Sequence, residues 1–158
     1  MPGKIFENLL IFKDGQLIIS KVYENLQYFI GSSNMTGAGS TPATAVSCSK
    51  KVSNQISFET IKIIKAISQK NITKPNGVYH SSVRYDIKNK PNITEINIGR
   101  FPSTNGLFNL FGKYNILDVY YKILLNKKLK LKNFIDNDLG NKVIITRSID
   151  QKPHVLKK

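Results

Sequence analysis

The chain has 158 residues, 41% of them hydrophobic, and a formal net charge of +14. This length and composition suit one domain with a modest core and exclude a disordered tail. No apolar run approaches the roughly 20 residues that cross a bilayer. The beginning of the chain shows no secretion signal, so we expect a single cytoplasmic domain over residues 1–158 that has no membrane partner.

The first half of the chain predicts a β-hairpin, a loop and a helix. Lys4–Phe12 and Gln16–Leu26 are rich in β-branched and aromatic residues, and the Asp14-Gly15 pair between them is a strong hairpin signal. Gly31–Pro42 holds almost no large side chain, which is typical of a connector or of a loop whose backbone approaches an anion. Ser57 predicts an N-cap, and the apolar positions 61, 63, 64 and 67 predict a helix of about three turns.

The second half predicts another hairpin, two helices and a closing strand. The expected elements are strands at Val78–Lys88 and Ile93–Arg100, helices at Leu107–Phe111 and from an Asn115 cap to about Asn126, and a strand at Gly140–Ile149. The resulting order β-β-α-β-β-α-β indicates an α+β fold. We expect a mainly antiparallel sheet with two or three helices on one side.

The composition leaves few kinds of site open. The single cysteine, Cys48, excludes an internal disulfide and a cysteine-based zinc site. The positive charge makes a basic nucleic-acid-binding domain an alternative function. Arginine, which base readout favours, occurs only at positions 84, 100 and 147, and the lysines are dispersed except in the run 127–132. We therefore expect no specific nucleic-acid partner.

The stretch Thr94–Arg100 combines a carboxylate, a carboxamide and a guanidinium within a predicted strand. Because side chains alternate along a strand, Glu95 and Asn97 should project from the same face. Two oxygen donors held in this way suit Mg²⁺, which proteins bind through one or two carboxylates plus the phosphates of a substrate. Arg100 offers a bidentate fork for a phosphate oxygen. A solvated strand edge with mixed polar residues is the alternative interpretation.

The order of these features resembles the C-terminal half of the ATP-grasp superfamily, most closely the carbamoyl-phosphate-synthase-like carboxylate–amine ligases. The likeness begins at Met1-Pro2-Gly3, includes the Asp-Gly hairpin, the glycine loop and the Glu-x-Asn pair followed by arginine, and continues to Ile116-Leu117-Asp118. It implies a lobe that binds ATP with Mg²⁺, or Mn²⁺ in its place. Such enzymes phosphorylate a carboxylate substrate to an acyl phosphate, which an amine then attacks.

The resemblance also implies roles for individual residues. Glu95 and Asn97 match the family's metal ligands. Arg100 aligns close to the arginine that contacts a phosphate in the family, and it is therefore the expected catalytic residue. The loop facing the transferred phosphate would contain Gly37, Gly39, Ser40 and Thr41. These four residues and Arg100 are the expected nucleotide-binding set.

The chain departs from the family pattern at several points. Ser82 stands where the family has an acidic or amide ligand, with Asp86 on the same strand as a candidate substitute, and Ile5 replaces a glutamate. No segment matches the first lobe, which holds the ATP phosphates. We therefore expect no turnover without that lobe, and expect a separate chain that carries it or a homodimer. A degenerate lobe that serves as an interaction or regulatory module is the alternative.

Overall fold

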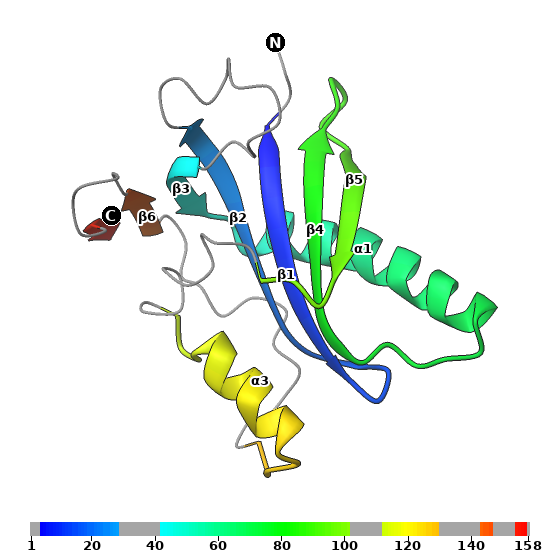
Figure 1. Cartoon of the computed structure of the whole chain (residues 1–158). Coiled ribbons are helices and arrows are strands. Elements are labelled where there is room, and N and C mark those ends of the chain that lie inside the picture. The colour runs from blue at the N-terminus through cyan, green and yellow to red at the C-terminus, as the bar shows by residue number, and fades with distance from the viewer. Residues whose placement is uncertain (1–3, 29–41, 102–111, 130–142, 147–153, 158) are drawn as a thin grey trace.

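The computed structural model describes residues 4–28, 42–101, 112–129, 143–146 and 154–157. These ranges form a seven-stranded antiparallel sheet in the order β5-β4-β1-β2-β3-β6-β7, together with two helices (Figure 1). The strands are β1 (Ile5–Lys13), β2 (Gln16–Tyr28), β3 (Pro42–Ser47), β4 (Gly77–Tyr85), β5 (Pro91–Ile98), β6 (Val143–Thr146) and β7 (His154–Lys157). The helices are α1 (Lys50–Lys70) and α3 (Ile116–Leu124). The predicted α+β class with an antiparallel sheet is confirmed.

The first hairpin forms where the sequence predicts it. Lys13 pairs with Gln16, so Asp14 and Gly15 alone make the turn between β1 and β2. Both have positive φ, 52° and 86°, as a type I′ turn requires. β1 lies between β2 and β4 in the sheet, which makes it a central strand.

Helix α1 packs on one face of the sheet and begins earlier than predicted. Its N-cap is Ser49, whose hydroxyl accepts a hydrogen bond from the backbone N–H of Val52 at 3.4 Å, whereas Ser57 is buried inside the helix. The Ser57 hydroxyl lies 2.7 Å from that of Ser20 on β2. The first two turns therefore face the sheet largely through small polar residues, and this hides the apolar period that marks a helix.

The two described helices lie on opposite faces of the sheet, which corrects the expectation that all helices share one side. Phe6, Leu10 and Phe12 of β1 belong to the apolar clusters under α1. Leu9 and Ile11 instead pack with the buried side chains of α3, which are Ile116, Val119 and Ile123. Since neighbouring side chains on a strand point to opposite faces, α1 and α3 cover opposite sides of β1. Apart from Glu7 and Asn8, β1 is apolar from Ile5 to Phe12, which fits a strand that is covered on both faces.

The edge of the sheet beyond β2 contains elements that the sequence reading did not identify. β3 was not predicted, and neither was β7. The closing strand expected at Gly140–Ile149 is present over its described part, where β6 pairs with β3. The short helix expected at Leu107–Phe111 lies outside the described residues. Within the described ranges, no helix combines the length and apolar character that a membrane span requires.

Candidate functional site

The sheet face that carries α3 is divided into an apolar half and a polar half. α3 packs on Leu9, Ile11, Ile19 and Val78. Beyond this cluster, the strand register aligns polar residues across β1, β4 and β5. One row is Glu7–Ser82–Glu95, and the next is Leu9–His80–Asn97. The residues predicted as metal ligands therefore lie within a larger polar group.

Glu95 and Asn97 share a face, as strand alternation predicted. The Asn97 Nδ2 donates a hydrogen bond to the Glu95 Oε1 at 2.9 Å, and the Glu95 side chain is exposed. Neighbouring ligand atoms of an octahedral Mg²⁺ are about 3 Å apart when each lies 2.0–2.1 Å from the ion. The spacing of the two side chains therefore fits one edge of a coordination octahedron, once the amide turns its oxygen toward the ion. Their role as metal ligands stays a prediction.

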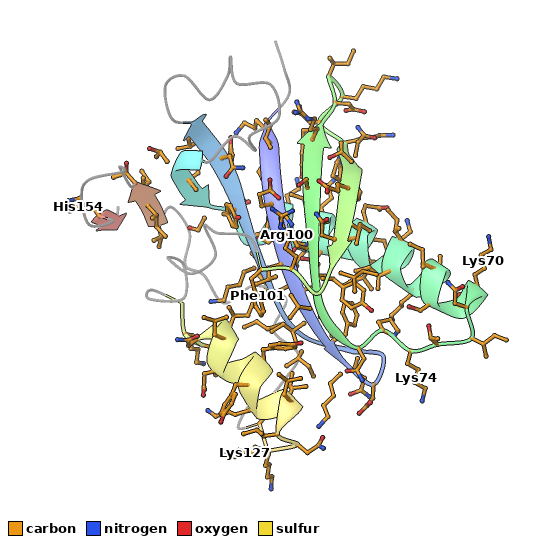
Figure 2. All side chains as sticks on the ribbon, viewed as in Figure 1. Lys70, Lys74, Arg100, Phe101, Lys127 and His154 are labelled. Carbon is orange, nitrogen blue, oxygen red and sulfur yellow. The ribbon has the colours of Figure 1, made fainter. Side chains whose placement is uncertain are left out.

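Arg100 lies over the same side of the sheet. After β5 the chain turns at Gly99, which has a φ of 77° and whose N–H donates to the Val78 carbonyl at 2.8 Å. The chain then crosses in front of β4 and β1, and Figure 2 shows Arg100 and Phe101 on this crossing. Phe101 is anchored against Tyr120 of α3, with ring centroids 5.5 Å apart. Arg100 is exposed on this crossing, on the side of the sheet that carries the polar half of the face.

Within this polar group, the cluster of side chains around Glu7 was not anticipated. The Glu7 Oε2 accepts hydrogen bonds from the Ser82 hydroxyl at 2.9 Å and from the His80 Nε2 at 2.5 Å. Because a carboxylate only accepts, the Nε2 of His80 carries the hydrogen. Strand alternation in the sequence could predict only which side chains of β1 share a face with Glu7. The pairing of β1 with β4 brings together residues 73 and 75 positions apart, and no short-range signal predicts that pairing.

Asp86 does not take the place of Ser82. It lies after the end of β4, where its Oδ1 accepts from the backbone N–H groups of Lys88 at 2.8 Å and Lys90 at 2.9 Å. The bond from Lys90, assisted by the one from Lys88, lowers the pKa of the Asp86 carboxyl. Asp86 therefore shapes the turn between β4 and β5.

The described residues do not form a closed metal site. No group of three His, Cys, Asp or Glu side chains that could hold a metal occurs among them. Glu95 and Asn97 can thus hold a cation only if other ligands, such as nucleotide phosphates, complete its coordination. The predicted loop residues Gly37, Gly39, Ser40 and Thr41 lie outside the described residues, and their roles stay predictions.

Two cationic residues on this face also escaped the sequence reading. Arg84 is exposed and shares a row with Ile5, next to the Glu7 row. Lys21 is fully buried, and its Nζ donates to the Tyr114 carbonyl at 2.9 Å, linking β2 to the segment before α3. Lysine is almost never fully buried without a partner, so this backbone contact has a structural role.

A cavity of about 690 Å³ lies on the opposite side, beside the start of α1. Its lining includes Phe6, Cys48, Lys51 and Tyr85. Burial raises the pKa of the Cys48 thiol to about 12, and the Glu24 carboxylate acts in the same direction. The thiolate is the nucleophilic form, so Cys48 is not poised for catalysis.

The raised pKa of Cys48 predicts slow thiol chemistry and alkaline instability. At pH 8 the native thiol should react with a disulfide reagent about a thousandfold more slowly than in denaturant, because its thiolate fraction falls tenfold per pKa unit. The stabilising contribution of the neutral thiol is fully present below the unfolded pKa of 9.0 and is lost as pH rises toward about 12. Urea unfolding at pH 8 and 10 measures this loss. Cys48→Ala should show a smaller loss, and equal losses would contradict the assignment.

Comparison with known proteins supports the fold but not a close relationship. No family model matches the sequence, and no curated protein matches it. Among solved structures, biotin carboxylase from Campylobacter jejuni, in a beta-gamma-ATP complex, aligns with a TM-score of 0.65 at 14% identity over 93% of this chain. The L-amino acid ligase from Bacillus licheniformis aligns with a TM-score of 0.59 at 12% identity over 92%.

A third structure is the biotin carboxylase domain dimer of the Hydrogenobacter thermophilus 2-oxoglutarate carboxylase, in complex with MgADP, ADP and bicarbonate. It aligns with a TM-score of 0.57 at 13% identity over 91% of this chain. The chain covers 30%, 34% and 29% of these three structures in the order given. The neighbours are ATP-grasp enzymes, so the fold that the sequence resemblance implied is confirmed. The chain therefore has the fold of about a third of an ATP-grasp enzyme.

Proposed function

We propose that this chain is one lobe of an ATP- and Mg²⁺-dependent carboxylate–amine ligase of the carbamoyl-phosphate-synthase-like type. The observation that carries the proposal is that Glu95 and Asn97 project from one face of β5, with the Asn97 Nδ2 2.9 Å from the Glu95 Oε1, within an ATP-grasp fold. The beta-gamma-ATP and MgADP complexes of the structural neighbours support ATP and Mg²⁺ as ligands. Mn²⁺ would substitute for Mg²⁺ at the same donors.

Each residue of the site has a distinct task in this proposal. Glu95 and Asn97 would hold the cation of a metal–nucleotide complex, and such a cation would supply neutralisation of phosphate charge. Arg100 would donate a bidentate pair of hydrogen bonds to two oxygens of a phosphate, positioned by the Gly99 turn and the Phe101 anchor. Gly37, Gly39, Ser40 and Thr41 would face the transferred group and help to exclude water from it, as the sequence resemblance implies.

The lobe needs a counterpart for turnover. We propose that a first lobe, on a separate chain, supplies the remaining contacts with ATP, and that the polar half of the α3-bearing face meets it. A homodimer through the same face is the alternative assembly. Light scattering on the pure chain distinguishes a dimer from a monomer.

A degenerate lobe that serves as an interaction module is the second candidate function. It is favoured by Ser82, which contributes a hydroxyl in place of a carboxylate, and by the lack of a closed metal site among the described residues. The nucleic-acid alternative has no comparable support. Figure 2 places Lys70 at the last turn of α1, Lys74 in the connection that follows it, and Lys127 beyond the end of α3.

Glu95→Gln tests the proposed function. In anisotropy titrations with a fluorescent ATP analogue, we expect weak binding that disappears with EDTA and falls about tenfold in the variant, because the amide cannot supply the ligand charge. Glu59→Gln is the matched control, since Glu59 lies on α1 and pairs with Lys62. Metal-independent binding, or equal affinity in Glu95→Gln, would contradict the proposal. Absence of any metal-dependent binding, with or without a first-lobe partner, would favour the degenerate lobe.

A further inference from the structure

A second carboxylate lies in the same cross-strand row as Glu95. Ser82 on β4 is the direct partner of Glu7 on β1 and of Glu95 on β5, and all three side chains project from one face. Neighbouring strands are about 4.8 Å apart, so the backbones of the two glutamates lie about 10 Å apart. The serine between them is short. Both glutamate side chains can therefore converge on one ion above Ser82.

The Glu7 carboxylate is already oriented for such a role. Both of its hydrogen bonds, from Ser82 and from His80, end on the Oε2 atom. The Oε1 atom makes no hydrogen bond with any described residue, and the side chain retains 16% exposure. One oxygen thus fixes the side chain while the other is available to a ligand.

His80 supplies an independent sign that the polar group is incomplete. The residue is 7% exposed, and its buried Nδ1 has no hydrogen-bond partner among the described residues. Buried polar atoms are nearly always bonded, so an orphan marks a place where a further polar group or ion belongs. His80 also pairs with Asn97 across β4 and β5.

We propose that Glu7 is a third ligand of the cation that Glu95 and Asn97 bind. This inference rests on the proposed function of the site. Ser82 and His80 are positioning residues that hold the Glu7 carboxylate, and Glu7 supplies from β1 the charge that Ser82 lacks on β4. The cation thus meets two carboxylates and one carboxamide, and the nucleotide phosphates complete its coordination.

Mn²⁺ binding to the full chain tests the role of Glu7. Electron paramagnetic resonance of free Mn²⁺, with ATP present, gives the affinity without any need for turnover. We expect Glu7→Gln and Glu95→Gln each to weaken Mn²⁺ binding about tenfold, as loss of a metal-site residue does. Glu24→Gln is the matched control, because Glu24 on β2 pairs with Lys4 and faces α1. Its affinity should equal that of the unmodified chain.

A rescue variant separates loss of a ligand from loss of structure. Glu7→Gln also alters the bonds with His80 and Ser82, so thermal unfolding is measured in parallel. The double variant E7Q/S82E returns a carboxylate to the centre of the row and should recover most of the lost affinity. Weakened binding in Glu95→Gln with normal binding in Glu7→Gln would overturn the role of Glu7 alone. Normal binding in both would overturn the proposed function as well.

Discussion

Replacement of Asn8 by alanine is expected to lower the free energy of unfolding by about 2–4 kcal/mol, because it removes two buried hydrogen bonds and leaves a cavity. Asn8 lies on β1, and its side chain is fully buried beneath α1. Its Oδ1 accepts from the Ser20 hydroxyl at 3.0 Å, and its Nδ2 donates to the Thr60 hydroxyl at 3.4 Å. Urea unfolding followed by circular dichroism measures the loss.

The size of this effect follows from the connections of Asn8. The Ser20 hydroxyl is also hydrogen-bonded with the Ser57 hydroxyl, and the Thr60 hydroxyl with the Ser81 hydroxyl at 3.1 Å. A chain of neutral polar groups therefore joins the sheet to α1. In a low-dielectric interior, a broken link costs more than an exposed hydrogen bond because water cannot replace it. The Asn8 side chain connects both halves of this chain.

Asn76→Ala is the matched control for Asn8. Asn76 is exposed in the connection between α1 and β4, so the same change should alter stability by about 0.5 kcal/mol or less. A small effect at Asn8 would mean that the hydroxyl groups re-pair among themselves. The polar layer would then contribute little to the attachment of α1.

Local rules predicted the parts of the fold that depend on few residues. The Asp14-Gly15 turn was identifiable because a two-residue turn with positive φ restricts the sequence strongly. The shared face of Glu95 and Asn97 followed from strand alternation alone. The cap of α3 at Asn115 was also visible, and the Asn115 Oδ1 accepts from the N–H groups of Leu117 and Asp118.

The features that sequence reasoning missed depend on contacts between distant segments. The start of α1 was hidden because its inner face is lined by Ser53, Ser57 and Thr60, whose burial follows from the polar layer opposite them. The position of α3 was missed because strand periodicity does not say which helix covers which face. Glu7 was missed because only the pairing of β1 with β4 brings it to Ser82. The described part of the candidate site therefore combines residues that the sequence placed there, on β5 and at Ser82 of β4, with Glu7 and His80, which it did not.

Leu9→Ala is expected to destabilise the protein by about 2–5 kcal/mol, the range for truncation of a fully buried leucine. Leu9 is fully buried where β1 meets α3, and it pairs across the sheet with His80. We expect amide hydrogen exchange to show loss of protection in α3, because this cluster holds the helix on the sheet. Leu124→Ala makes the same change at an exposed position of α3 and should cost about 0.5 kcal/mol or less. Unchanged protection of α3 in Leu9→Ala would mean that other contacts, such as that of Lys21 with Tyr114, suffice to hold the segment beside the polar site.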